Sequence, residues 1–297
     1  HKVRMALGIA SASWQSVEIP RLPPKPLLVP LTAGYRRTPV LQIGADIYCD
    51  SQNIAHAIDQ SGAPRRLFTD QTHGLAMMIS NWAETTLFDL SVRLVLTHAL
   101  GKVPEEFIRD RGSLYFGSNW TEASLRAALP SVMHELRASL GFVEAHLAAT
   151  DGTYLNGQKP CYGDAALGYI CWFLRGRWDG GGTLLANYPA LSALEAALDR
   201  LGDGQPQDMD AEAALAIATA AMPQSPIGII DGASSLAIGQ TVMIRPKGET
   251  ADPDVVGTLR YCDGMRISID HRHEQVGHVA VHFPVVGYVM TPIDLAV

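Results

Sequence analysis

The apolar residues of this 297-residue chain change their spacing twice, and this change most constrains the fold. From Thr69 to about Arg200 they recur with the period of roughly 3.6 residues that marks amphipathic helices. Beyond Pro223 they form short runs separated by turn residues, which is typical of a small all-β module of about five strands. Because one layer of structure cannot satisfy both patterns, the sequence predicts a multidomain α+β protein that contains an all-α helical bundle.

The first 68 residues follow neither pattern. His1–Ala10 has helical spacing, Trp14–Pro20 alternates like a strand, and a proline-rich connector follows. Two short strands, at 38–44 and 46–51, are joined by Gly44 and Ala45 as a hairpin, after which a helix opens at Ser51. This order predicts an α/β unit whose first strand is absent from the sequence.

Charge and composition exclude several classes of function. The net charge of −7 opposes binding to a phosphate backbone, so we expect no nucleic-acid partner. No apolar run approaches the roughly 18 residues that span a bilayer, and no leader pattern opens the chain. The four cysteines lack metal-type spacing. We therefore expect a soluble, cytoplasmic protein with reduced thiols and no membrane partner.

Two motifs carry a family resemblance. The segment GYRRTPVLQIGADIYCDS contains the run Thr38–Leu41 followed by the pair Asp50 and Ser51, and it resembles the glutathione-binding core of the glutathione transferases. The segment GQKPCYGDAALG resembles the second hallmark of that family, in which a helix begins after a proline. Here Cys161 replaces the usual Ser or Thr cap; because sulfur is a poor acceptor, we expect this helix start to be weaker by up to ~1 kcal/mol.

The resemblance implies a three-part architecture. Residues 1–68 would form an incomplete thioredoxin-like glutathione-binding domain, whose first strand precedes His1. Residues 69–222 would form the all-α domain of the family. Residues 223–297 would form an additional small all-β domain, for which the resemblance implies no settled role.

The resemblance also implies where glutathione binds as a co-substrate. With a cis bond before Pro39, the main chain of Thr38 would pair with the cysteinyl unit. Ser51, at a helix N-terminus, would bind the γ-glutamyl carboxylate, and Asp50 would accept from the ammonium. Arg37 would pair with the glycyl carboxylate. Considered without the family context, a strand-start proline and a simple N-cap are the more ordinary interpretations of Pro39 and Ser51.

Two further assignments stay open. Arg36 is the rival of Arg37 for the glycyl carboxylate. The resemblance places the residue that activates the thiol in a turn before His1, so no catalytic residue is named. Cys49 adjoins Asp50, but the nucleophile of the cysteine-type relatives lies at that missing turn, and Cys49 is interpreted as buried strand filler.

The histidines near the C-terminus raise a separate hypothesis. His271 and His273 have strand spacing and would share one face, with His278 and His282 nearby. Because no acidic or thiol ligand stands at clear spacing, incidental histidines on a strand are the favoured interpretation and no metal is expected.

The function that the resemblance implies is a glutathione transferase. Such an enzyme joins the glutathione thiolate to a small hydrophobic electrophile, as in detoxification, and works as a homodimer. The alternative is a non-catalytic protein of the same fold that binds a partner. An intact N-terminal turn without Ser, Tyr or Cys would favour the alternative.

Overall fold

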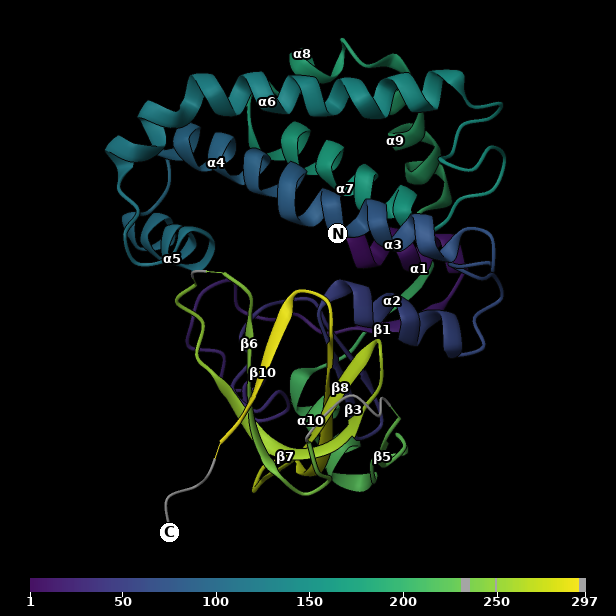
Figure 1. The fold of residues 1–297 in the computed structure, drawn as a ribbon, viewed down its shortest axis with the longest axis vertical. Coiled ribbons are helices and arrows are strands. Elements are labelled where there is room, and N and C mark those ends of the chain that lie inside the picture. The colour runs from purple at the N-terminus through teal and green to yellow at the C-terminus, as the bar shows by residue number, and fades with distance from the viewer. Residues whose placement is uncertain (231–235, 249, 294–297) are drawn as a thin grey trace. The chain divides into compact units, whose positions relative to one another are not determined.

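The computed structural model describes residues 1–230, 236–248 and 250–293 (Figure 1). The chain divides into two compact units, each built from two separate stretches of sequence. The helical unit comprises His1–Trp14 and Ile58–Pro206, and the sheet unit comprises Gln15–Ala57 and Gln207–Val297. The boundaries predicted after residues 68 and 222 follow changes in the sequence pattern. The two units are defined differently, by contacts within the fold, and each therefore combines separate stretches of the chain.

The helical unit forms from the stretch with helical spacing, as predicted, together with the N-terminal helix. Its elements are α1 Lys2–Ala10, α3 His73–Trp82, the π-helix η1 Ala83–Leu87, α4 Phe88–Ala99, α5 Glu105–Phe116, α6 Glu122–Ala149, α7 Tyr162–Arg177, α8 Gly181–Leu185 and α9 Pro189–Leu201. α7 packs against α1, α3, α4, α8 and α9, and α6 lies along α4 (Figure 1). α7 is therefore the central helix of this unit.

A buried carboxylate organises the start of α7. Asp164 is fully buried, and its Oδ2 accepts the N–H of Cys161 at 2.7 Å while its Oδ1 accepts the N–H of Leu155 at 2.8 Å. Burial raises the pKa of Asp164, although these backbone hydrogen bonds act in the opposite direction. The carboxylate at the third helical position thus supports a helix start in which Cys161 supplies sulfur in place of oxygen.

The sheet unit is built on one eight-stranded sheet. Its strands are β2 Val40–Ile43, β3 Asp46–Cys49, β5 Gly228–Ile229, β6 Thr241–Pro246, β7 Val255–Cys262, β8 Arg266–His273, β9 Gly277–Pro284 and β10 Tyr288–Pro292. Their order is β10-β6-β7-β8-β9-β3-β2, with β5 paired to β7. The five strand-like runs predicted beyond Pro223 are all strands, β6 to β10. The segment 223–297 also includes positions outside the described residues.

The hairpin β2–β3 belongs to the same sheet as the C-terminal strands. β3 pairs in parallel with β9, with Ile47 opposite Val281 and Tyr48 opposite His282. The C-terminal strands therefore extend the hairpin of the N-terminal region instead of forming a separate sheet. The strand predicted at Trp14–Pro20 is shorter: β1 covers Ser13–Ser16 and pairs with β4, Gln205–Asp208, in a two-stranded sheet.

The core of the sheet unit lies against the inner face of this sheet. Helix α10, Ala211–Ala220, packs on β9 and adds Leu215 and Ala218 to the core. The fully buried members from the strands include Ile47, Val242, Ile244, Leu259, Ile269, Val279, Val281 and Phe283. Over the described residues, every helix is too short or too polar to cross a bilayer. The fold as a whole is the mixed α+β arrangement that the sequence predicts.

Candidate functional site

The hairpin β2–β3 brings the two predicted halves of the glutathione site together. In its register Val40 lies opposite Cys49, so the residues just beyond them, Pro39 and Asp50, emerge at the same end of the hairpin. The Thr38–Pro39 peptide bond is cis, and both residues are exposed. β2 is also the last strand of the sheet, so the main chain next to Thr38 lies at a sheet edge.

Asp50 forms the N-terminus of helix α2, Ser51–Gln60. Its Oδ1 accepts the N–H of Gln52 at 2.9 Å, and its carbonyl accepts the N–H of Ile54 at 2.9 Å. Asp50 has φ 71°, in the left-handed region that aspartate tolerates better than most residues. Ser51 follows as the first helical residue and is 7% exposed. Asp50, and not Ser51, is thus the capping residue.

A tyrosine from the last strand contacts the same carboxylate. The hydroxyl of Tyr288, on β10, donates to Asp50 Oδ2 at 3.3 Å and lies 3.1 Å from the hydroxyl of Tyr35. Burial raises the pKa of both tyrosines well above the usual value, so both hydroxyls keep their protons at neutral pH. Tyr288 therefore fixes the orientation of Asp50 as a hydrogen-bond donor.

The two arginines before Thr38 share one carboxylate. Asp252, in the connection between β6 and β7, accepts from Arg36 Nε at 3.1 Å through Oδ1 and from Arg37 Nε through Oδ2. Arg37 Nη2 also donates to the Thr250 hydroxyl at 3.0 Å. Burial lowers the pKa of Arg37, but the charge of Asp252 raises it by more. The net pKa lies above the ordinary value, so Arg37 remains a cation.

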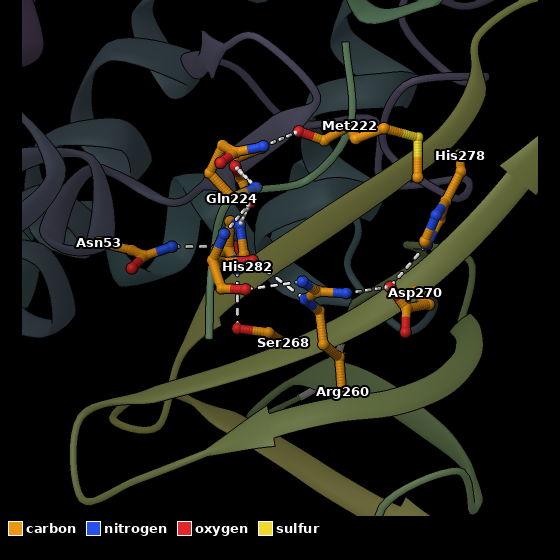
Figure 2. A network of polar contacts seen from close by, with 10 residues as sticks. Asn53, Met222, Gln224, Arg260, Ser268, Asp270, His278 and His282 are labelled. Carbon is orange, nitrogen blue, oxygen red and sulfur yellow. Dashed lines mark hydrogen bonds and ion pairs between the residues drawn. The ribbon is translucent and has the colours of Figure 1, made fainter. Parts of the chain in front are cut away.

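A buried polar network holds α2 against the sheet (Figure 2). The ring of His282, on β9, lies between the Ser268 hydroxyl, 2.7 Å from Nδ1, and Asp46 Oδ1, 3.0 Å from Nε2. Asn53, in the first turn of α2, donates to the carbonyl of His282 at 2.9 Å and to that of Cys49 at 3.3 Å. The helix start that carries Asp50 and Ser51 is therefore tied to two strands.

The charges within this network are well defined. Burial would raise the pKa of Asp46, but hydrogen bonds from His282, Ser225 and the N–H of Gln224 outweigh it and lower the pKa to about 2. Burial lowers the pKa of His282 and so favours the neutral ring. A neutral ring donates from Nε2 to the Asp46 carboxylate and accepts the Ser268 hydroxyl at Nδ1. Serine, histidine and aspartate lie in line here, but all three are buried, which indicates a structural role.

The histidines of the metal hypothesis contact protein groups. His278 Nε2 lies 2.7 Å from Asp270 Oδ1, which also accepts from Arg260 at 3.0 Å (Figure 2). The rings of His271 and His273 are 6.2 Å apart. Within the described part of the chain, no three His, Cys, Asp or Glu side chains are grouped to hold a metal ion.

The thiol next to the site is inert. Cys49 is fully buried, and burial raises its pKa well above the usual value. The other three cysteines are also buried, and none of them forms a disulfide.

Sequence reasoning missed the two residues that the C-terminal strands add to this site. Tyr288 lies 238 positions from Asp50, and Asp252 lies 215 from Arg37. Neither stands in a motif, and no local pattern signals a pairing over such a distance. The pairing of β3 with β9 joins the N-terminal hairpin and the C-terminal strands in one sheet.

Comparisons with known proteins show which sequences and folds the chain resembles. Residues 1–66 match the family model described as glutathione S-transferase, N-terminal domain. A GST-like protein from Pseudomonas syringae is 28% identical, with a TM-score of 0.79 over 98% of this chain and 94% of that one. A glutathione S-transferase from Methylobacterium radiotolerans, in complex with glutathione sulfonate, is 18% identical, with a TM-score of 0.46 over 70% of this chain and 91% of that one. No curated protein matches the chain.

The family match and the full-length likeness point to the same class of protein. Residues 1–66 match the N-terminal domain of glutathione S-transferases, and the whole chain, with its strand-rich C-terminal region, is similar to a GST-like protein. Its likeness to the Pseudomonas syringae protein extends over that region as well, because it covers nearly the whole chain.

Proposed function

We propose that this protein binds glutathione at the end of the β2–β3 hairpin and transfers its thiolate to a small hydrophobic electrophile. The observation that carries the proposal is the register of the hairpin, which sets Pro39 beside Asp50. A sheet edge, a helix N-terminus, a carboxylate and a cation thus meet at one point. These are the groups that a tripeptide with two carboxylates and one ammonium requires.

Each group has a proposed role. The main chain of Thr38 pairs with the cysteinyl unit at the edge of β2, as a short added strand. The γ-glutamyl carboxylate binds at the N-terminus of α2, where Ser51 lies, because the positive end of the helix dipole favours an anion there. Asp50 accepts from the ammonium, and Arg37 pairs with the glycyl carboxylate.

The chemical step is a nucleophilic substitution or addition. The thiol loses its proton, the thiolate sulfur forms a bond to an electrophilic carbon, and a leaving group departs with its electron pair where one is present. We assign no catalytic residue, because Cys49, the thiol beside the site, is fully buried. A cytoplasmic homodimer, with no nucleic-acid or membrane partner, is part of the same proposal.

One observation favours a second candidate, a binding protein of this fold without catalysis. Ser51 is only 7% exposed, and Arg37 is already paired with Asp252. Both groups are thus engaged within the protein, and no residue at the site is assigned to activate a thiol. Binding of glutathione without conjugation would support this candidate.

The test pairs Ser51→Ala with Ser61→Ala in the full chain. Ser61 lies just beyond the C-terminal end of α2, where its hydroxyl donates to the Ile58 carbonyl, far along the helix from the proposed site. Calorimetric titration with glutathione is expected to show binding about tenfold weaker or worse for Ser51→Ala, since a hydrogen bond to a charged group is lost. Ser61→Ala should retain the wild-type affinity.

A conjugation assay with an activated aryl halide then separates the two candidates. Binding with turnover supports the transferase, and binding without turnover supports the second candidate. If the wild-type protein binds no glutathione, or if Ser51→Ala binds as well as wild type, the proposed site is refuted.

A further inference from the structure

The contact between Asp252 and the two arginines is unusual in its completeness. Nε and Nη2 form one edge of a guanidinium group, the edge that grips a carboxylate with two parallel hydrogen bonds. On Arg37 this edge is filled by Asp252 at Nε and by the Thr250 hydroxyl at Nη2. The other carboxylate oxygen of Asp252 accepts a hydrogen bond from Arg36, and the Asp252 side chain is 4% exposed.

The two partners of Arg37 are also bonded to each other. The N–H of Asp252 donates to the Thr250 hydroxyl at 3.2 Å, so the two acceptors of Arg37 brace each other. On the other side, Lys25 Nζ donates to the carbonyl of Arg36 at 2.9 Å and is 6% exposed. Lys25 is thus bonded to the main chain of the same arginine pair whose side chains hold Asp252.

From this geometry we infer that Asp252 is an internal competitor: its carboxylate occupies the anion-binding edge of Arg37, and a ligand carboxylate must displace it to bind there. The identity of that ligand carboxylate, the glycyl end of glutathione, rests on the proposed function. The β6–β7 connection thereby sets the affinity of the site. It also disfavours ligands whose carboxylate cannot outcompete an intramolecular one.

The experiment compares Asp252→Asn with Asp254→Asn in the full chain. Asp252→Asn keeps the size of the side chain but removes the charge that competes for Arg37. Asp254 lies two residues further on and is exposed, so its substitution removes the same charge from the same segment without touching the arginine pair. The two probes are glutathione and γ-glutamylcysteine, which lacks the glycyl unit.

Competition predicts a selective gain. Asp252→Asn should bind glutathione about three- to tenfold more tightly than wild type, with unchanged affinity for γ-glutamylcysteine, and Asp254→Asn should match wild type for both. Weaker glutathione binding by Asp252→Asn would mean that Asp252 positions Arg37 for the ligand, and the inference would be overturned. Equal changes for both probes would overturn it too.

Two further measurements keep the inference testable. If Asp252→Asn does not fold, as judged by far-UV circular dichroism, Thr250→Ala removes the other occupant of the Arg37 edge and should give a smaller gain in the same direction. If no variant binds either peptide, the proposed function fails, and titration with sulfate then decides the inference alone. A sulfate-induced rise in thermal stability that is larger for Asp252→Asn than for Asp254→Asn supports competition, whereas equal responses refute it.

Discussion

Asp164 in the helical unit and Asp46 in the sheet unit are both buried, yet their surroundings shift their pKa values in opposite directions. Asp164 accepts hydrogen bonds from the backbone N–H groups of Leu155 and Cys161, and burial raises its pKa. Asp46 accepts from His282 as well as from two backbone N–H groups, and its pKa falls to about 2.

The difference lies in how far along the chain each carboxylate reaches. Asp164 bonds to residues at most nine positions away and stabilises one helix start. Asp46 bonds to His282, 236 positions away, and so joins β3 to β9 and to the segment after α10. At the local cap, burial disfavours the charge of Asp164. In the long-range connection, the hydrogen bonds to Asp46 favour its charged form.

The isosteric change of each aspartate to asparagine tests this comparison most strongly. Asp46→Asn removes a charge that the fold favours as well as an acceptor, so we expect a loss of about 3 kcal/mol in the free energy of unfolding. Asp164→Asn removes a charge that burial disfavours and leaves one acceptor in place, so about 1 kcal/mol is expected. Urea denaturation followed by far-UV circular dichroism measures both.

Tryptophan fluorescence provides the control for this experiment. All five tryptophans lie in the helical unit, so their emission follows that unit while circular dichroism follows the whole chain. Asp46→Asn should therefore affect the dichroism transition at least as strongly as the fluorescence transition. An equal or larger cost for Asp164→Asn would contradict the proposed difference between the two carboxylates.

Acidification gives the second test, with a somewhat smaller effect. The folded pKa of Asp46, about 2, is below the ordinary 3.8, so its contribution is present above pH 3.8 and is lost as the pH falls towards 2. It amounts to about 2 kcal/mol. The pKa of His282 is also lowered, from 6.5, so the unfolded chain takes up that proton first and stability also falls as the pH drops below about 6.5.

The variant His282→Gln separates the two windows. Glutamine retains a donor for Asp46 but does not titrate, so the loss of stability below about pH 6.5 should be smaller than in wild type, and the loss near pH 3 should remain. Free energies of unfolding from urea titrations between neutral pH and about pH 3 measure this. Parallel curves for the two proteins would show that His282 does not contribute.

The same contrast between local and long-range contacts explains what could be predicted from the sequence. The helix at Lys2–Ala10, the hairpin and the start of α7 were predicted because spacing, turn residues and caps act over a few positions. The parallel pairing of β3 with β9 was not predicted, because the sequence of one strand does not indicate which distant strand it pairs with. The expected site residues Thr38, Pro39, Asp50 and Ser51 lie at one end of the hairpin, whereas Tyr288 and Asp252 come to it from more than 200 positions away.

The smallest predicted effect concerns the local side of the comparison, the cap of α7. In Cys161→Ser a hydroxyl oxygen replaces sulfur as the acceptor at the helix start, which should raise the free energy of unfolding by up to ~1 kcal/mol. Cys171→Ser is the matched control, because Cys171 is fully buried in the middle of the same helix, where a hydroxyl meets no exposed helix-end N–H and should destabilise. Opposite signs for the two serines, measured by urea denaturation, would place the effect in the cap. The Asn156 side chain donates to the Cys161 sulfur at 3.5 Å. A loss of stability in Cys161→Ser would therefore mean that the fit of the larger sulfur atom in this pocket matters more than a stronger acceptor at the cap.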